Sequence, residues 1–224
     1  MKDIYIKAAT EEFETARNEI RRKSPVEALE ASFGRMDRLI QETMASSDPK
    51  ATCTKGCNYC CYFKIDLRAH EALVIAEYIK KRLKPPQVDR ILATATANAT
   101  QIRHLTVKEH LSRNFQCPFL HDGACSIYVV RPLKCRNFHQ TDVLRCKKSF
   151  DEPHNLSVPN SFVLEVHAVG NGHADGFVKA AENEGYDSNV YELNTAILEA
   201  VSDSTFLKKY RKKKRTFLTA INVE

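Results

Sequence analysis

A chain of 224 residues that is 43% hydrophobic and 28% charged can bury its own core and is typical of a globular protein, not of a disordered or fibrous one. Seven glycines and no tryptophan favour a fold with few tight turns, most of it helical. The charged stretch 1–23 does not resemble a secretory signal, and no apolar run is long enough to span a bilayer. We therefore expect a cytoplasmic protein whose thiols stay reduced.

Apolar residues recur at helical spacing through most of the chain. The clearest start is at Ser24-Pro25-Val26-Glu27, where Ser24 can cap, Pro25 suits the first helical position and Glu27 can close a capping box. In the segment 162–184, Gly170-Asn-Gly172 predicts a break between two helical pieces. The pattern predicts helices over 4–23, 24–45, 70–83, 87–103, 107–114, 162–184, 191–201 and 205–215.

The net charge of +6 comes from one stretch near the C-terminus. Residues Lys208 to Arg215 contain seven of the 34 basic side chains, and without them the chain is close to neutral. Such a stretch could bind phosphates of a nucleic acid, an acidic protein surface or anionic lipid headgroups. It could equally be a solvated last helix whose cations complement the helix dipole.

All eight cysteines lie between residues 53 and 146, in two blocks. The first block holds Cys53, Cys57, Cys60 and Cys61, and the second holds Cys117, Cys125, Cys135 and, a little further on, Cys146. Thiolates are soft ligands suited to zinc, copper(I) and iron–sulfur centres. The alternative is that these are buried free cysteines that behave as small hydrophobes. For the isolated Cys146 both interpretations stay open.

The spacing of the first block limits how a metal can be held. Cys57-x2-Cys60 lets two thiolates converge on one ion. Cys60 and Cys61 are adjacent and should point in different directions. Cys61 would therefore serve a second metal, complete a polynuclear cluster or be a buried thiol. Eight thiolates could build two zinc centres, or one iron–sulfur cluster with four thiols to spare.

The cysteine pattern resembles a known family. The residues that carry the likeness are Cys53-x3-Cys57-x2-Cys60-Cys61, Cys117-Pro-Phe-Leu, and Gly-x-Cys125-x-Ile-Tyr-x-x-Arg131-Pro132-x-x-Cys135-Arg136. They look like the CxxCxxCC cysteine-cluster family, the YkgJ-type zinc- or iron-chelating domain, to which flagellin lysine N-methylases also belong. The resemblance covers 53 to about 140, leaves Cys146 just beyond it, and implies metal binding without a settled activity.

Other polar residues of the second block have plausible supporting roles. Arg131 and Arg136 bracket Cys135 and could offset thiolate charge or lock loop carbonyls. His121 and His139 could replace a thiolate in a mixed site, although a hydrogen-bonded or surface histidine is the simpler interpretation. Four carboxylates attract attention but nothing in the sequence pairs them: Asp66, Glu71, Glu165 and Asp175.

Together these patterns predict a mainly α protein whose helices wrap an irregular, metal-bound, Cys-rich core with at most a short hairpin. We expect 1–224 to form a single domain, with 48–150 as the cysteine-cluster module and 1–47 and 159–224 as flanking helices. The expected function is binding of zinc or iron, the latter including an iron–sulfur cluster. Two alternatives are a protein-lysine N-methyltransferase-like enzyme, for which we find no S-adenosylmethionine loop, and a metal-stabilised adaptor that binds an acidic partner or nucleic acid through Lys208 to Arg215.

Overall fold

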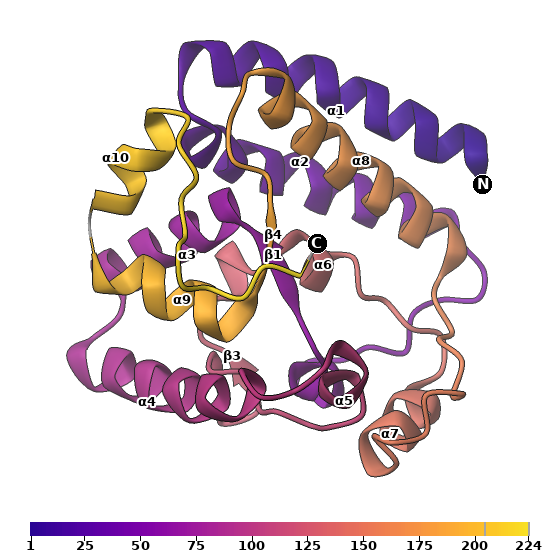
Figure 1. Cartoon of the computed structure of the whole chain (residues 1–224). Helices are drawn as coiled ribbons and strands as arrows, with labels where there is room; N and C mark the ends of the chain where they lie inside the picture. Colours follow the sequence, from indigo (N-terminus) through magenta and orange to yellow (C-terminus); the bar gives the residue numbers. More distant parts are fainter. Residues whose placement is uncertain (204, 224) are drawn as a thin grey trace.

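Helices make up most of the chain, which confirms the mainly α prediction (Figure 1). The computed structural model describes residues 1–203 and 205–223. The α-helices are α1 (Lys2–Arg22), α2 (Pro25–Ser46), α3 (Ala69–Arg82), α4 (Pro85–Ile102), α5 (Val107–Leu111), α6 (Leu133–Arg136), α7 (Val143–Asp151), α8 (Leu164–Asn183), α9 (Leu193–Ser202) and α10 (Thr205–Arg211). The 3-10 turns are η1 (Tyr59–Tyr62) and η2 (Tyr128–Val130), and the strands are β1 (Asp66–Arg68), β2 (Leu120–His121), β3 (Ala124–Cys125) and β4 (Val190–Glu192).

Helix α8 is continuous, so the predicted break at residues 170–172 is wrong. Gly172, like Gly176 one turn further on, instead serves close packing, because α8 lies along α1 (Figure 1). A Cβ at Gly172 would lie 2.3 Å from the carbonyl oxygen of Tyr5, and one at Gly176 would lie 2.3 Å from that of Ala9. Only glycine allows the two backbones to approach this closely.

The capping box predicted at the start of α2 is confirmed. The Glu27 carboxylate accepts hydrogen bonds from the backbone N–H and the hydroxyl of Ser24, both at 2.9 Å. These bonds lower the pKa of Glu27. Since the carboxylate satisfies a free amide at the N-terminus, the start of α2 is fixed by local sequence.

Two small antiparallel sheets interrupt the helices. The pair β2–β3 is the expected short hairpin, but it uses only two residues on each side, and Tyr128–Val130 forms a 3-10 turn instead of extending the strand. The pair β1–β4 was not predicted; it sets Leu67 opposite Tyr191. Because both of these side chains are buried, this long-range pairing ties the segment after the first cysteine block to the C-terminal part of the chain.

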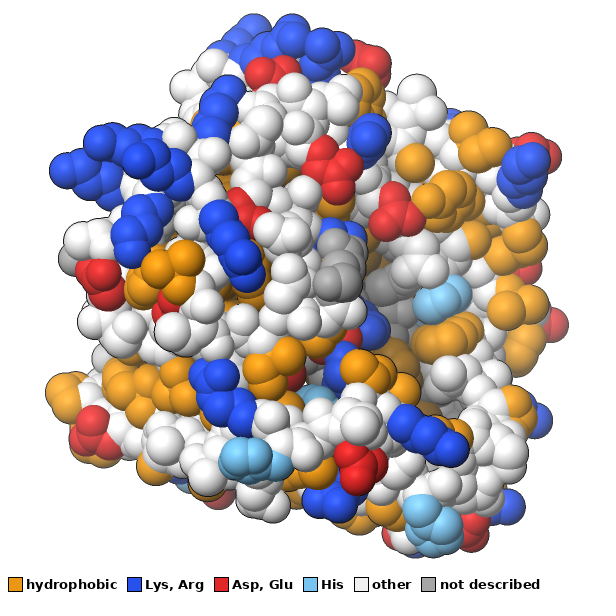
Figure 2. Space-filling view, viewed as in Figure 1, with side chains coloured by type: hydrophobic (Ala, Val, Ile, Leu, Met, Phe, Trp, Pro, Cys, Tyr) orange, Lys and Arg blue, Asp and Glu red, His pale blue; other side chains and the backbone are white. Residues whose placement is uncertain are grey.

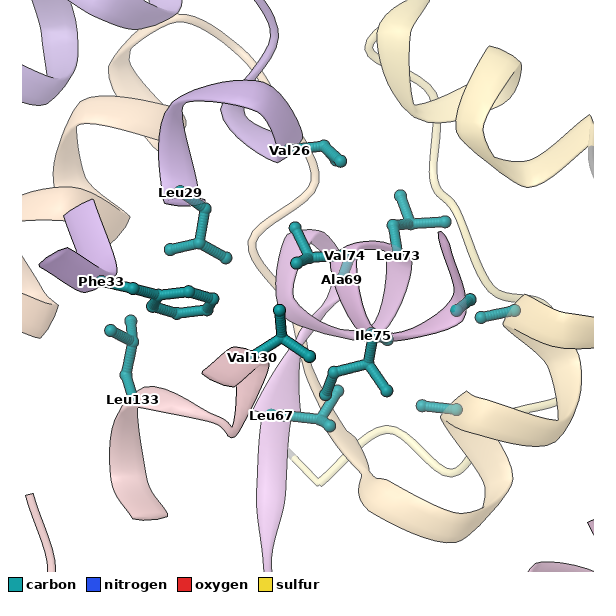
Figure 3. Packing of buried hydrophobic residues seen from close by; sticks show 14 of the residues in the cluster. Val26, Leu29, Phe33, Leu67, Ala69, Leu73, Val74, Ile75, Val130 and Leu133 are labelled. Carbon is teal, nitrogen blue, oxygen red and sulfur yellow. The ribbon is translucent and has the colours of Figure 1, made fainter. Parts of the chain in front are cut away.

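One buried apolar cluster connects the helices to the second cysteine block. Figure 3 shows Leu29 and Phe33 of α2 beside Val130 of η2 and Leu133, the first residue of α6, with Ile75 of α3 close by. All five side chains are less than a tenth exposed. Their burial removes apolar surface from water, and it fixes the position of the chain segment that carries Cys135.

The C-terminal segment packs back onto the helices, and helix α10 ends at Arg211, short of the predicted 215. Glu199 of α9 accepts hydrogen bonds from the backbone amides of residues 218, 219 and 220 at 2.7–2.9 Å. Figure 2 shows lysine and arginine side chains gathered over α10. Among the described residues, no helix has the length and apolar character needed to cross a membrane.

Candidate metal centre

The first cysteine block lies in a loop that leads into the turn η1. Gly56 has a left-handed φ of 91°, and the amide of Cys57 donates to the carbonyl of Thr54 at 3.0 Å, which closes a tight turn. Cys60 and Cys61 lie in η1. A 3-10 turn has three residues per turn, so adjacent side chains point about 120° apart.

Backbone hydrogen bonds join the two cysteine blocks directly. The amide of Cys117 donates to the carbonyl of Cys61 at 2.7 Å, and the amide of Phe115 donates to the carbonyl of Tyr62 at 3.1 Å. At the other end of the loop, the amide of Thr52 donates to the carbonyl of Gln140 at 2.8 Å. The two blocks, distant in sequence, therefore form one region.

Local structure positions each thiol of the second block. Cys125 lies on β3 of the hairpin, whose turn has left-handed φ angles at Asp122 (48°) and Gly123 (72°). Cys135 lies in the short helix α6, whose first amide, that of Leu133, donates to the carboxylate of Glu71 at 2.8 Å. The position of Cys135 thus depends partly on a residue of α3.

Four thiols form what we term the inner cysteine group: Cys61, Cys117, Cys125 and Cys135. Burial raises the pKa of Cys135 to about 12, with the charges of Cys125 and Cys61 contributing in the same direction. Burial likewise raises the pKa of Cys117, with Cys135, Cys61 and Cys125 adding to the effect. Each thiol of this group is close enough to feel a neighbour's charge, so four thiolates there would repel one another strongly without a cation.

Two backbone amides favour the thiolate form within the inner group. Burial is the largest influence on Cys117 and Cys125 and raises both pKa values. Against this, the amide of Phe119 donates to the sulfur of Cys117 and that of Ile127 to the sulfur of Cys125, and each bond lowers the pKa. Amide-to-sulfur bonds of this kind orient a thiolate and offset its charge, as expected around a metal.

The remaining four thiols form the outer cysteine group: Cys53, Cys57, Cys60 and Cys146. Burial raises the pKa of Cys146 to about 11, with the nearby Cys53 and Cys57 contributing in the same direction. Helix α7, which carries Cys146, packs against η1, where Phe150 contacts Tyr62 edge to face with ring centroids 4.9 Å apart. The structure therefore places Cys146 beside the first block.

Cys60 and Cys61 connect the two groups. Their thiols are hydrogen-bonded, which raises the pKa of Cys60 and lowers that of Cys61. Cys60 also feels the charges of Cys135 and Cys53, one from each group. Ionisation of one thiol of the pair therefore makes ionisation of the other more costly.

The donor set fits a soft cation such as zinc or iron. All eight cysteines are free thiols. Across residues 1–203 and 205–223, no three His, Cys, Asp or Glu side chains already surround a common point as metal ligands. Thiolates are nevertheless soft donors, and a bound cation would replace mutual repulsion among them by attraction.

The two candidate histidines lie in different surroundings. His121 is on the hairpin, 46% exposed, with Nδ1 3.1 Å from the carboxylate of Asp122. His139 is half-buried and follows α6, and burial lowers its pKa. Within the described chain its Nε2 has no hydrogen-bond partner. His139 lines a cavity together with Cys53, whereas His121 does not line it.

The two arginines differ in their contacts: Arg136 is bound to a carboxylate and to backbone carbonyls, whereas Arg131 lies near the thiols. Arg136 is 1% exposed, donates to the carboxylate of Asp37 at 2.6 Å and to the carbonyl of Arg131 at 3.2 Å, and stacks 4.0 Å above the ring of Phe33. Arg131 stacks 3.9 Å above the ring of Tyr128 and donates to that residue's carbonyl. Its charge lowers the pKa values of two inner-group thiols, against the larger effect of burial.

Two important carboxylates were not predicted at this site. Asp37 of α2 pairs with both arginines, and Glu71 of α3 holds the start of α6. Glu71 appeared only as an unpaired carboxylate in the sequence. Its place three residues into a helix is a capping signal, since it also accepts from the amide of Arg68 at 2.8 Å. No local sequence pattern predicts the contact between Glu71 and Leu133, which are far apart in the chain.

The comparison with protein families agrees with this chemistry. Residues 52–157 match the model of the CxxCxxCC family, described as a putative zinc- or iron-chelating domain. No curated protein and no solved structure matches the chain. The matched span contains every cysteine, and it extends past Cys146 to include α7.

Proposed function

We propose that this protein holds zinc or an iron–sulfur centre through the thiolates of its cysteine cluster, and the match of residues 52–157 to the CxxCxxCC family model supports this. One observation carries the proposal. The amide of Cys117 donates to the carbonyl of Cys61 at 2.7 Å, and this bond brings the two cysteine blocks together. Thiols from both blocks then act on one another electrostatically within a largely buried region.

We further propose that the inner and outer cysteine groups are separate four-thiolate centres. Four thiolates complete a closed tetrahedral zinc site or the ligand set of one iron–sulfur cluster. The adjacent Cys60 and Cys61 would then serve different centres, which resolves the steric difficulty of placing both on one ion. Cys146 supplies the fourth thiol of the outer group, as its electrostatic contact with Cys53 and Cys57 supports.

A zinc ion would supply stability, whereas an iron–sulfur centre would supply redox chemistry. Zinc held by four thiolates has no redox chemistry and contributes folding free energy. An iron–sulfur centre would add electron transfer, with a potential set by hydrogen bonds to the sulfurs and by solvent exposure. Either centre needs reduced thiols, so the proposal includes a reducing compartment such as the cytoplasm.

Metal analysis of protein purified without oxygen tests the proposal. We expect at least one metal equivalent per chain and a fall in the melting temperature when a chelator removes it. A brown protein that absorbs near about 400 nm would identify an iron–sulfur centre, and a colourless one with zinc would identify a structural site. Substoichiometric metal, or a chelator without effect on thermal stability, would refute the proposal.

A further inference from the structure

A cavity of about 710 Å³ lies between the C-terminal half of α2 and the segment 128–139. Its volume is within the range of about 300–1,000 Å³ that is common for small-molecule sites. Cys53 of the outer cysteine group lies in its wall, and His139 lines it from the end of the second block. The cavity therefore adjoins the cysteine cluster.

Positive charge predominates in this cavity. Lys50, Arg131 and Arg136 line it, and Asp37 is the one carboxylate among the lining residues, all of which are described. Asp37 pairs with Arg136 at 2.6 Å but reaches Arg131 only at 3.7 Å. One carboxylate cannot neutralise three cations, so the cavity favours an anion.

Arg131 is the side chain best placed to hold that anion. Arg136 is engaged with Asp37 and with the carbonyls of Val129 and Arg131. The hydrogen bond that Arg131 makes goes to the carbonyl of Tyr128, which leaves other N–H groups of its planar fork for a ligand. A guanidinium fork matches the two oxygens of a carboxylate.

Two further polar groups and an apolar wall complete the cavity. Lys50 is exposed at its rim, where its ammonium also donates to the carbonyls of Met44 and Ala45, each at 2.7 Å. The Nε2 atom of His139 is buried and has no partner within the described chain. Ile40, Met44 and Ala51 supply apolar surface, which an organic ligand would cover and an inorganic ion would not.

We infer that this cavity binds a small organic carboxylate, with its carboxylate group held by Arg131 and Lys50 and its apolar part against α2. Arg131 also acts on the thiols of Cys125 and Cys135, so the ligand would lie beside the cysteine cluster. The binding charges belong to the protein's own side chains, and the inference therefore does not depend on which metal is bound.

Calorimetric titration with benzoate at constant ionic strength tests the inference on the full chain as purified, with its metal content measured. Benzamide has the same shape without the charge, and inorganic phosphate has charge without the ring. We expect benzoate to bind, and benzamide and phosphate to bind at least about tenfold more weakly. Arg131→Gln should weaken benzoate binding about tenfold, because one charge-assisted contact is lost.

Two further variants keep the test decisive. Lys50→Gln changes an exposed residue and should weaken benzoate binding severalfold. Arg38→Gln removes the same charge from α2 beside Asp37 but outside the cavity lining, and it should bind benzoate normally. The inference is overturned if benzoate does not bind, if benzamide or phosphate binds as tightly, or if Arg131→Gln and Lys50→Gln bind like Arg38→Gln. If the protein purifies without metal and still binds benzoate, the metal-binding proposal fails and the inference about the cavity stands.

Discussion

Glu71 of α3 accepts a hydrogen bond from the backbone amide of Leu133 at 2.8 Å, and this bond holds the first turn of the helix that carries Cys135. The other carboxylate oxygen accepts from the amide of Arg68, also at 2.8 Å. The side chain is buried, and burial raises its pKa while the two amides lower it. One carboxylate thus fixes the starts of two helices, α3 and α6, and with them a thiol of the inner cysteine group.

Glu71→Ala should therefore destabilise the protein and weaken its metal centre. Two amides would lose their partner, and each unsatisfied buried amide costs about 1–3 kcal/mol. We expect a loss of about 2–4 kcal/mol in the free energy of unfolding, measured by urea denaturation, together with easier removal of metal by a chelator. Glu77→Ala is the control: it lies on the same helix and pairs with Lys81 at the surface, so it should change stability by less than about 0.5 kcal/mol. Equal stability of the Glu71 variant and the parent would contradict this role.

The packing of α8 on α1 predicts a large effect from a small substitution. In Gly172→Ala the new methyl group would meet the backbone carbonyl of Tyr5 at 2.3 Å, and a backbone atom cannot move aside as a flexible side chain can. We expect a loss of about 3 kcal/mol or more, as for overpacked cores.

Gly34→Ala on α2 is the matched control for that substitution. Its nearest neighbour would be the Arg38 side chain at 3.9 Å, which is ordinary contact. Alanine there should raise stability by about 0.5–1 kcal/mol, since glycine is a poor helix former. Thermal melts of both variants check the pair. A Gly172 variant as stable as the Gly34 variant would show that the helices are not in this close contact.

Features governed by neighbouring residues could be predicted from the sequence. Helical spacing located most of the long helices, and the Ser24-to-Glu27 capping box correctly marked the start of α2. The thiol-rich segment was recognisable because soft ligands at short spacing are typical of a metal centre. These signals are local in origin, so they do not depend on how the rest of the chain folds.

Features that depend on distant contacts could not be predicted. Glycines 170 and 172 suggest a break in isolation, and only the close approach of the Asn137 side chain to Gly170 and of α1 to Gly172 shows why they lie within a helix. The pairing of β1 with β4, the Glu71–Leu133 bond and the position of Cys146 beside the first block likewise join residues far apart in sequence. Their energies come from burial in the folded state, which a local pattern does not encode.

The proposed division of the cysteines predicts separable metal losses. Cys125→Ala should remove the metal of the inner group and spare the outer one, whereas Cys146→Ala should do the reverse, because each centre would lose one of four ligands. Metal per chain, measured on anaerobically purified variants, checks this. Lys147→Ala, next to Cys146 and exposed, should keep all metal. If either cysteine variant loses every metal ion, the thiols form one polynuclear centre and the two-centre proposal is wrong.

The last prediction concerns acid stability and rests on His70 of α3. This side chain is fully buried against the ring of Phe177, and the hydroxyl of Tyr210 lies 3.3 Å from its Nδ1. Burial lowers the pKa of His70 to about 3, with the charge of Arg68 contributing and that of Asp187 opposing. The folded protein therefore holds a neutral imidazole where the unfolded chain, with its ordinary pKa of about 6.5, takes up a proton.

The folded-state pKa lies below the unfolded one, so His70 has no effect above about pH 7 and costs stability as the pH falls from about 6.5 toward 3. At pH 5 the cost is about 2 kcal/mol, since each pKa unit corresponds to about 1.4 kcal/mol. In His70→Leu that part of the loss should disappear, so the drop in unfolding free energy between pH 8 and pH 5 should be about 2 kcal/mol smaller than in the parent. Urea denaturation at the two pH values measures it, and exposed His104→Leu should keep the parent's dependence. An unchanged pH dependence in His70→Leu would mean that His70 is protonated in the folded protein.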